Sequence, residues 1–401
     1  MANADIYRYT AELQYVKGNT ATTIDSKNIK NIVIDSNYDQ LNMPLLFLSV
    51  AIDKNLLDDM VKNSDTALIN LTIYKYIDSD GIGKTNTIYI REQFVYFITD
   101  DLNERREIDN SDEMKKENQD LLKLITIGLL KLDWLNKNKK QFNGVISNTT
   151  MINMIYYCAG HLPMLIEPLT YNKSLDQIIL PPINSVSKAL DYLNKISAFY
   201  STQYRFFMDF DTVYLVSSSG TITPKKGDHI NSIIINIGST SNVGINVQGM
   251  YTDKTQKAYI FNINTGDFAS NINKASQKSF NTISAVTTKQ SIGDTELGIK
   301  TSSYIQSKST LIRLPNDNTN LLGNIKSNIE NNSLIIELNK NDLDSSVLTI
   351  NREFMIKTTD MDESYRIYDG KYILSRKREL FLREDETFRS NVMLTLKKLN
   401  A

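Results

Sequence analysis

Alternation of apolar and polar residues dominates the first hundred positions and predicts short β-strands. Ile6–Tyr15 contains the period of two that is typical of a strand with one buried face, and Leu45–Ile52 is an apolar run typical of a buried strand. Further strands are predicted over Ala67–Tyr76, Thr87–Ile90 and Gln93–Ile98. Short strands at roughly regular spacing favour a sandwich or a small barrel, so residues 1–103 are predicted to form a first β-barrel domain.

The pattern changes to a helical one after this domain. Mixed-charge runs at 104–107 and 112–117 have helical potential, and the leucine-rich stretch Leu121–Leu132 presents a wide apolar face that Trp134 closes. Residues 104–141 are therefore predicted to be a helical connector that packs on its neighbours. Within the first domain, Leu56–Lys62 predicts one short helix.

Residues 142–227 are predicted to form a small α+β domain. One helix is predicted over Thr150–Ala159, and a second follows Ser185, whose hydroxyl can cap it. The apolar stripe of this second helix has the i, i+3, i+4, i+7 spacing and consists of Val186, Ala189, Leu190, Leu193 and Ile196. Two β-rich runs around an Asp-Phe-Asp turn predict a hairpin over Tyr204–Val216. Because this stretch holds no cluster of titratable residues, we expect it to hold other parts in position and to do no chemistry.

The β pattern returns in residues 228–401, which are predicted to form a second β-barrel domain. A buried strand is expected over Ser232–Ile237, and Val243–Tyr251 with Gln256–Asn264 predicts a hairpin. A polar insertion lies at about 265–331 and includes a predicted helix over Asn318–Asn331. Four strands are expected to close the chain, over Ser333–Leu338, Arg352–Lys357, Lys371–Phe381 and Thr387–Leu399, the last two forming a hairpin. The predicted fold class is thus α+β and mainly β, with two β-barrel domains joined by the helical connector and the small α+β domain.

Charge and composition exclude several classes of function. The 401 residues carry 45 basic and 46 acidic side chains, a net charge of −1, so the chain generates no field that would attract nucleic acid or an anionic membrane. Its one cysteine, Cys158, rules out an intramolecular disulfide and is typical of a reducing compartment. No signal peptide is expected at the N-terminus, and no apolar run approaches the roughly 20 residues of a membrane-spanning helix.

The sequence offers few residues for catalysis or metal binding. Cys158 and His161 are three residues apart, which would suit a thiolate–imidazole pair or half a metal site, but core packing and a helix terminus explain them better. His229 is interpreted as a turn residue. Neither a nucleophile-elbow motif nor a P-loop motif occurs. Adjacent carboxylates could be drawn as a glycosidase pair, but their polar contexts indicate solvated turns; they are Asp58-Asp59, Asp100-Asp101 and Glu384-Asp385-Glu386. We therefore predict no catalytic, cofactor-binding or metal site and no cofactor.

Aromatic residues and one basic run leave alternatives open. The 21 Tyr and 14 Phe could form a carbohydrate-binding surface, although strand propensity and protein interfaces also explain them. The candidates are Tyr7, Tyr9, Tyr15, Tyr200, Tyr204, Phe206, Phe207, Phe210 and Tyr214. The mixed run Arg376–Glu379 and the pair Lys397-Lys398 are predicted to lie on a solvated strand face, or alternatively to line a lumen or to face a neighbouring subunit.

Three stretches carry a resemblance to a known family. They are Asn37–Leu48, the capped helix Ser185–Tyr200 followed by Phe206–Val216, and a strand that begins Gly370-Lys371-Tyr372 and returns as the alternating run Phe388–Leu396. Together they resemble an early strand of the first barrel, a helix with an aromatic-rich strand pair, and the closing hairpin of the baseplate hub of contractile-tailed bacteriophages. That family is related to late-control tail proteins and to the hub part of type VI secretion spikes.

The resemblance implies a structural role without enzymatic activity. Hubs of this family are homotrimers in which each chain gives two similar β-barrels, and the resulting ring has pseudo-sixfold symmetry and joins the threefold central spike to the sixfold tail tube. The implied partners are the central spike protein, a tail tube or tube-initiator protein and baseplate wedge proteins. The implied location is the tail baseplate of the virion, with the late protein assembled in the host cytoplasm. Because the chain stops at Ala401, just after the last predicted strand, no fused spike or hydrolase is expected.

Two other functions are kept as alternatives. The aromatic residues would suit a receptor- or cell-wall-polysaccharide-binding tail-tip protein. The scattered carboxylates are the only motivation for a hydrolase.

Overall fold

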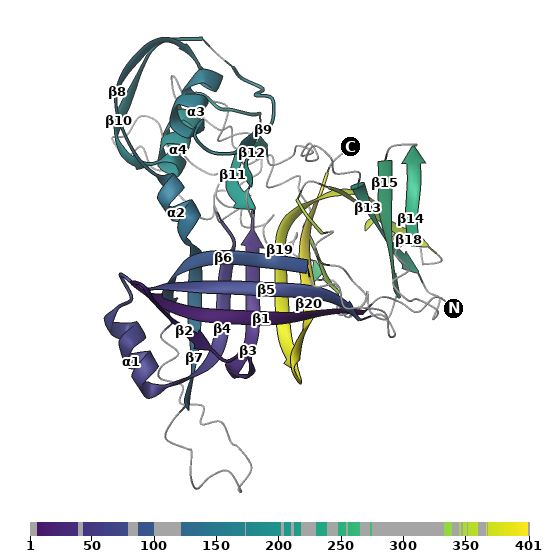
Figure 1. The fold of residues 1–401 in the computed structure, drawn as a ribbon. Helices are drawn as coiled ribbons and strands as arrows, with labels where there is room; N and C mark the ends of the chain where they lie inside the picture. Colours follow the sequence, from purple (N-terminus) through teal and green to yellow (C-terminus); the bar gives the residue numbers. More distant parts are fainter. Residues whose placement is uncertain are drawn as a thin grey trace, which may run out of the picture.

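The computed structural model is mainly β, and its described part contains four short α-helices (Figure 1). The structure describes residues 6–38, 43–78, 87–99, 122–172, 174–201, 204–209, 212–217, 230–238, 248–253, 256–264, 273–274, 333–338, 345, 348–350, 352–359, 366 and 368–399.

Eight strands close into a β-barrel. They are β1 (Ile6–Lys17), β3 (Ile29–Asn37), β4 (Leu45–Asp53), β5 (Leu68–Asp78), β6 (Thr87–Ile98), β7 (Leu122–Lys131), β19 (Gly370–Glu384) and β20 (Thr387–Lys398). The order of pairing is β19–β3–β4–β7–β6–β5–β1–β20, and β20 pairs again with β19. The contact between β1 and β20, at Tyr9 opposite Phe388, closes the circle. A short strand, β2 (Thr20–Ile24), adds to the edge of β1 and leads through a 3-10 turn (Ser26–Asn28) into β3.

Side chains alternate between the inside and the outside of the barrel along each strand, and the inward-facing ones fill its interior. In β3, for example, Ile32 and Ile34 are buried, whereas Val33 and Asp35 are half-buried on the outside. The largest buried side chains of this core are aromatic: Tyr9, Phe94, Phe381 and Phe388. Helix α1 (Lys54–Lys62) packs two buried residues, Leu57 and Met60, against the same core.

A small α+β unit follows β7 in the chain and lies beside the barrel, at the top of Figure 1. Its elements are α2 (Leu132–Asn138), β8 (Lys139–Thr150), α3 (Met151–Ala159), β9 (Met164–Ile166), β10 (Ser174–Ser185), α4 (Val186–Ile196), β11 (Tyr204–Asp209) and β12 (Thr212–Ser217). β8 and β10 form a two-stranded ribbon, and β11, β12 and β9 form a second small sheet. Its core surrounds Trp134, which lies 5.6 Å from the Phe206 ring, measured between ring centroids.

The remaining strands extend the sheet on the other side of β19 and β20. They are β13 (Ile230–Gly238), β14 (Gln248–Asp253), β15 (Gln256–Asn264), β16 (Asn273–Lys274), β17 (Ser333–Leu338) and β18 (Glu353–Thr359). In the described residues they pair in the order β14–β15–β13–β18–β19 on one side and β20–β17–β16 on the other. Ile233, Phe354 and Leu394 are among the buried residues of the core of this second half.

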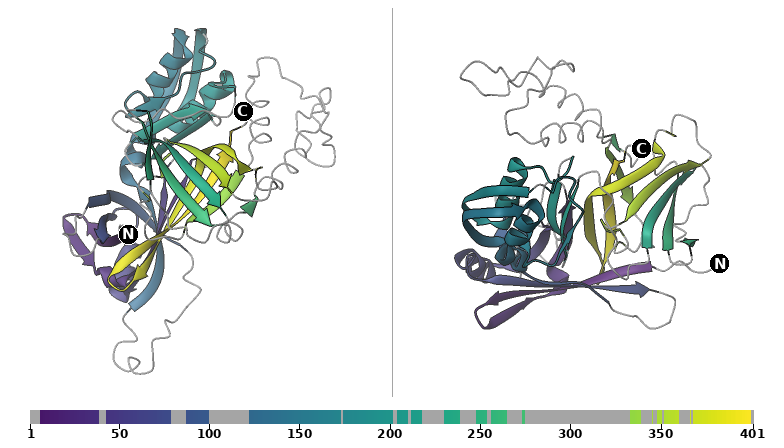
Figure 2. Two further views of the ribbon diagram at one scale, coloured as in Figure 1. Left: turned by 90° about the vertical axis from the view of Figure 1, so that its right-hand side faces the viewer. Right: turned by 90° about the horizontal axis from the view of Figure 1, so that it is seen from above.

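The hairpin of β19 and β20 therefore belongs to both halves. The first part of β19, Tyr372 with its neighbours, pairs with β18, and the part after Ser375 pairs with β3 of the barrel. β20 divides in the same way, because Phe388 faces β1 and Val392–Lys397 pairs with β17. Both views of Figure 2 show this yellow hairpin between the purple barrel strands and the green strands of the second half.

Several predicted elements are confirmed. The helices expected at Leu56–Lys62 and Thr150–Ala159 are α1 and α3. Helix α4 begins directly after Ser185, whose hydroxyl accepts a hydrogen bond from the Lys188 backbone amide, as the capping argument predicts. The hairpin over Tyr204–Val216 is β11 with β12, and the closing hairpin of the chain is β19 with β20.

The helical connector predicted over 104–141 is wrong over Leu122–Lys131 and from Lys139 onward, and its residues 104–121 lie outside the described residues. Leu122–Lys131 is strand β7, which lies between β4 and β6 and completes the barrel. Both ladders supply backbone hydrogen bonds that a helix at this position would not form, and this tertiary pairing overrides the helical tendency of the leucines. Within the predicted connector, only Leu132–Asn138 is helical in the described part of the chain.

Other predictions stay untested. A second closed barrel similar to the first is not confirmed, because the second half is an open path of strands in the described residues. The helix predicted over Asn318–Asn331 lies outside the described residues, as does the insertion at 265–331 except for β16. The domain boundaries stay predictions.

Candidate functional site: the hairpin shared by both halves

A β-bulge at Ser375 divides the shared hairpin into its two parts. The register between β19 and β20 shifts between Leu374 and Arg376, so Ser375 is an extra residue in β19. A bulge bends its strand and increases the local twist, which lets one strand follow the barrel and then leave it.

Backbone carbonyls freed at the bulge connect the hairpin to both other parts of the molecule. The Tyr38 amide, at the end of β3, donates to the Ser375 carbonyl at 3.0 Å. The buried guanidinium of Arg205, on β11 of the α+β unit, donates to the Leu374 carbonyl at 3.5 Å and to the Ser217 carbonyl at 3.3 Å. The bulge is thus the point at which the barrel, the second half and the α+β unit meet.

Two oppositely charged side chains are buried next to this bulge. Lys377 and Glu379 are two residues apart on β19, so both point into the barrel. Their side chains are 3% and 0% exposed, and the Lys377 Nζ lies 3.4 Å from the Glu379 Oε2. Each has a second partner: Lys377 Nζ donates to the Ser345 carbonyl at 3.1 Å, and the Tyr89 hydroxyl donates to the Glu379 carboxylate at 2.7 and 2.8 Å.

Burial keeps the tyrosines around this pair protonated. Burial raises the pKa of Tyr89 well above its usual value, and the negative charge of Glu379 raises it further. The pKa of Tyr38 is raised in the same way, by burial and then by the negative charge of Asp209. The Tyr38 hydroxyl donates a hydrogen bond to the Asp209 carboxylate at 3.4 Å. These phenols therefore act as donors, and the cluster satisfies its buried charges internally.

The prediction that Arg376–Glu379 lies on a solvated strand face is wrong for two of the four residues. Lys377 and Glu379 face the interior, whereas Arg378 is exposed and Arg376 forms an ion pair with Asp35 on β3. The alternation of burial along β19 explains the difference, because a strand that closes a barrel must turn every second residue inward even where those residues are charged.

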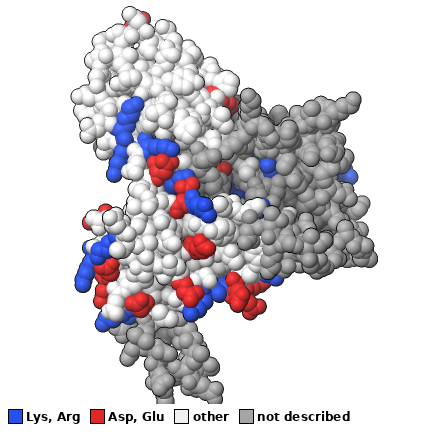
Figure 3. Space-filling view, viewed as in Figure 1, with Lys and Arg blue, Asp and Glu red and all other residues white. Residues whose placement is uncertain are grey.

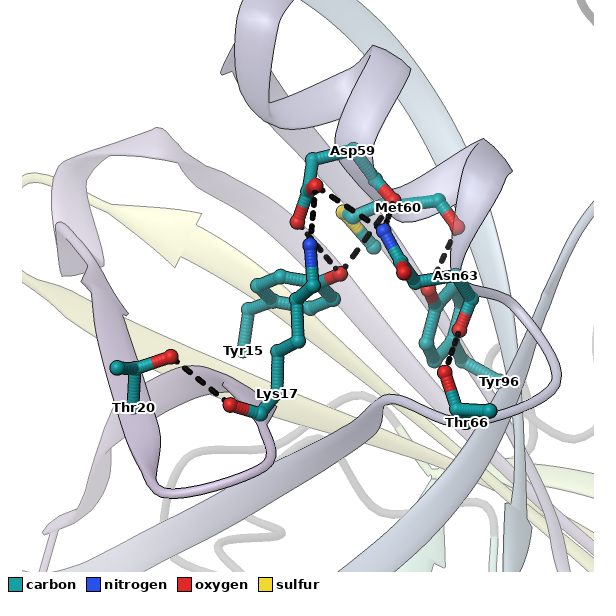
Figure 4. A network of polar contacts seen from close by, with 8 residues as sticks. All are labelled: Tyr15, Lys17, Thr20, Asp59, Met60, Asn63, Thr66 and Tyr96. Atoms are coloured by element: carbon teal, nitrogen blue, oxygen red, sulfur yellow. Dashed lines mark hydrogen bonds and ion pairs between the residues drawn. The ribbon is translucent and has the colours of Figure 1, made fainter.

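A second polar network attaches α1 to the barrel (Figure 4). The Asp59 carboxylate accepts from the Tyr15 hydroxyl at 2.9 Å and from the Lys17 ammonium at 2.7 Å. The Tyr96 hydroxyl donates to the Met60 carbonyl at 2.7 Å, and the Asn63 amide group donates to the Asp59 carbonyl at the same distance. One helix is thereby bound to β1 and to β6 through side chains that all converge on Asp59 and its neighbour.

Replacing Asp59 by asparagine is expected to lower the melting temperature at neutral pH. The hydrogen bond from Lys17, followed by that from Tyr15, lowers the pKa of Asp59 below its usual 3.8. A carboxyl with a lowered folded-state pKa stabilises the protein above its unfolded-state pKa, and this contribution is lost as the pH falls through the lowered value. The difference between wild type and Asp59→Asn should therefore be constant above about pH 4 and should shrink in more acidic solution.

Thermal melts across pH measure this difference. The exposed neighbour Asp58 provides the matched control, because Asp58→Asn removes a carboxylate from the same helix turn and leaves the network of Figure 4 in place. A difference between wild type and Asp59→Asn that persisted unchanged into strong acid would contradict the role given to the Asp59 charge.

Acidic and basic side chains are interspersed over the front of the barrel (Figure 3). The ion pairs among the charged side chains of the barrel include Arg8 with Glu384, Lys131 with Glu92, and Arg389 with Glu384. The hydrogen bond from Arg8, followed by the one from Arg389, lowers the pKa of Glu384. Because the pairs offset one another, this face presents no field of one sign, as the near-zero net charge predicts.

A family model matches residues 5–399, nearly the whole length of the sequence, and its description is bacteriophage PBS1 gene 109 protein. The chain belongs to this family. No curated protein matches the sequence.

Solved structures give weak similarities to this member of the PBS1 gene 109 family. A tail protein from Neisseria meningitidis MC58 is 10% identical with a TM-score of 0.39, and the match covers 97% of this chain and 96% of that one. A 43 kDa tail protein of prophage MuSo2 from Shewanella oneidensis is 10% identical with a TM-score of 0.41 and 96% coverage of both chains. A chain of the Francisella PdpA-VgrG complex is 11% identical with a TM-score of 0.41, and 54% of its length is covered. These low values carry no argument about function.

The structure separates the residues that could have formed a cysteine–histidine site. Cys158 is buried on α3, and burial raises the pKa of its thiol to about 12, so it is not a nucleophile at neutral pH. His161 is exposed, and its Nε2 lies 3.0 Å from the Lys137 carbonyl. His229 and the pair Asp100-Asp101 lie outside the described residues. Among the residues that are described, no three His, Cys, Asp or Glu side chains are grouped as a metal site would require.

Most of the aromatic candidates for sugar binding belong to the cores. The buried ones are Tyr9, Tyr15, Tyr200, Phe206, Phe207 and Tyr214. Tyr7 and Tyr204 are half-buried, and Phe210 lies outside the described residues. Strand propensity and core packing thus explain the described side chains, and the eight candidates that the structure describes do not form an exposed aromatic platform.

The buried Lys377–Glu379 pair is the site feature that sequence reasoning missed. One signal was available: the run Lys371–Phe381 is longer than a usual strand, and it carries Leu374 and Phe381 on either side of its charges. Which of these charges face inward depends on the bulge at Ser375, which sequence periodicity does not reveal. No helix in the described part of the chain combines the length and apolar character needed to cross a bilayer.

Proposed function

We propose that this protein is the structural hub of a phage tail baseplate, in which three copies form a ring that joins the central spike to the tail tube. The ring has pseudo-sixfold symmetry because each chain contributes two β-barrel domains, the described barrel and a second one built on the far part of the shared hairpin. The hub works in the baseplate of a contractile tail and is assembled in the host cytoplasm. Its partners are the spike protein, a tube or tube-initiator protein and baseplate wedge proteins.

The shared β19–β20 hairpin is the observation that carries this proposal. An adaptor between a threefold spike and a sixfold tube needs the two halves of each chain to keep a fixed relative position, since each half occupies one of six places in the ring. Two strands that run without interruption from one half into the other supply that rigidity through backbone hydrogen bonds. Membership in a phage protein family and the resemblance of three sequence stretches to baseplate hubs support the same role.

A structural role without catalysis agrees with the chemistry of the described residues. Their buried charges are satisfied by one another around Lys377 and Glu379, and the thiol of Cys158 is inert. The ring itself requires contacts between different surfaces of neighbouring copies, because only head-to-tail contacts close into a threefold ring.

The mass of the purified chain in solution tests this role. Three chains of 45.7 kDa each, about 137 kDa in total, are expected by light scattering or analytical ultracentrifugation at micromolar concentration, alone or together with a tail tube or spike protein. Because the spike and tube bind the ring and not the single chain, addition of either partner should increase the trimeric fraction. A species of one chain that persists at high concentration and in the presence of both partners would refute the proposed hub.

A further inference from the structure

One side of the barrel exterior carries a continuous apolar row that crosses five strands. The row consists of outward-facing residues that are direct cross-strand partners, in the order Leu380, Val33, Phe47, Gly128 and Phe97 on β19, β3, β4, β7 and β6. We call this row with its flanking positions the barrel face. Phe97 remains 39% exposed, Leu380, Val33 and Phe47 are half-buried, and Gly128 is buried.

The glycine at the centre of the row shapes this face. A Cβ atom at Gly128 would lie 2.2 Å from the Phe97 ring, so only glycine lets that ring lie flat on β7. Phe47 approaches from the other side, with its ring centroid 6.5 Å from that of Phe97 in an edge-to-face arrangement. The two rings and the glycine form a shallow aromatic surface that strand propensity alone does not require.

Residues that flank the row are mostly uncharged. Leu382, Asn31, Ser49 and Thr126 follow in register on one side. On the other side lie Arg378, Asp35, Leu45, Leu130 and Val95. Arg378 and Asp35 are the two charges among these positions, and Asp35 forms its ion pair with Arg376, the next outward residue of β19. Other outward positions of the same barrel differ, because Glu12 on β1 and Arg91 on β6 are charged and exposed.

These features indicate a protein partner. Five strands about 4.8 Å apart and three rows about 7 Å apart give the barrel face roughly 300 Å². That is the size of the apolar centre of an interface that buries about 800 Å² on each partner behind a polar rim. The middle strands are hydrogen-bonded on both sides, so an added peptide strand finds no free edge here. The charges at the edge of the barrel face, Arg376, Arg378 and Asp35, sum to only +1 and give little attraction for anionic lipid.

A second uncharged surface lies on the α+β unit of the same chain. On the two-stranded ribbon of β8 and β10, Val145 and Ile179 are direct partners and are 56% and 60% exposed. The cross-strand pairs next to them, Ser147 with Gln177 and Thr149 with Leu175, are also uncharged. We call these six residues the ribbon face. It belongs to a different unit from the barrel face, as a head-to-tail contact requires.

We infer that the barrel face of one copy receives the ribbon face of the next copy, and that this contact is the one that closes the ring. The inference rests on the proposed hub function and names the two surfaces that build it. Both surfaces are apolar at the centre. The ribbon face carries no charge, and the charges of the barrel face lie at its edge, where a polar rim leaves them in contact with water.

Two single substitutions and their mixture test the contact. Phe97→Glu introduces a charge into the barrel face, and Ile179→Glu introduces one into the ribbon face. Each variant alone is expected to be a single chain by ultracentrifugation, because a ring needs both surfaces on every copy. The control Gln14→Glu introduces the same charge on an outward position of β1, a strand outside the five that form the barrel face, and it is expected to remain trimeric. Circular dichroism and thermal melting of each variant confirm that it is folded.

Mixing the two variants is decisive for the head-to-tail arrangement. Phe97→Glu keeps an intact ribbon face and Ile179→Glu keeps an intact barrel face, so an equimolar mixture should form a dimer of about 91 kDa, two chains of 45.7 kDa. A folded Phe97→Glu variant that stays trimeric would overturn the assignment of the barrel face and leave the ring itself standing. A mixture that contains only single chains would overturn the pairing of the two faces. A wild-type protein that is a single chain under all conditions would refute the hub and with it this contact.

Discussion

Replacing Glu379 by glutamine is expected to destabilise the protein by about 3–5 kcal/mol. The substitution removes one charge of a pair whose members are 3% and 0% exposed, and it leaves the ammonium of Lys377 buried without a counter-charge. Glutamine has nearly the same volume and can still accept the hydrogen bond that Tyr89 donates, so the loss reports the charge itself. Urea unfolding followed by far-ultraviolet circular dichroism measures the effect.

A double substitution separates the charge from the packing. Lys377→Met combined with Glu379→Gln removes both charges and keeps the side-chain volumes similar, and it is expected to recover at least half of the lost stability. A single variant as stable as wild type would show that the buried ammonium is satisfied by the Ser345 carbonyl alone. A double variant with the same free energy of unfolding as the single variant would show that the destabilisation comes from altered packing and not from the unpaired charge.

Replacing Phe381 by alanine is expected to have an effect of similar size, about 3–5 kcal/mol. Phe381 is completely buried, and its ring centroid lies 4.9 Å from that of Tyr9 and 6.1 Å from that of Tyr89. The substitution leaves a cavity where the hairpin meets β1, and the surrounding strands are held by backbone pairing and cannot collapse into it. Phe381→Leu, which leaves a smaller cavity, should lose less.

An exposed residue on the same strand provides the control. Lys371 lies near the start of β19 with its side chain 58% exposed and pairs with Glu353 across the surface. Lys371→Ala should cost less than about 1 kcal/mol. Equal losses at Phe381 and Lys371 would show that the strand is sensitive to any substitution, and would contradict the particular role of the aromatic contact.

Local sequence signals predicted the elements whose stability is local. The helix after Ser185 was predictable because its cap and its apolar stripe are both encoded within about twelve residues. The structure contains the cap and buries four of the five stripe residues, and it leaves Ile196 exposed at the end of the helix. The closing hairpin was predictable for the same reason, since alternation and a charged turn lie next to each other in the chain.

Features that depend on distant pairing could not be predicted. Leu122–Lys131 has the composition of an amphipathic helix, and only the strands β4 and β6 on either side of it decide that it is extended. Lys377 and Glu379 look like solvated charges in the sequence, and only the closure of β19 against β3 turns them inward. The apolar row on the barrel exterior joins residues from position 33 to position 380, so no window of the sequence contains it.

The shared hairpin also has a mechanical consequence. β19, with 15 residues, is about 50 Å long and β20, with 12, about 40 Å, and a pull along them loads the hydrogen bonds of each ladder in shear. β3 and β18 pair with successive stretches of β19, on opposite sides of the bulge at Ser375, so tension along this strand passes through the two ladders in series. In a force spectrometer the shorter ladder, three residue pairs with β18, should rupture before the seven pairs with β3.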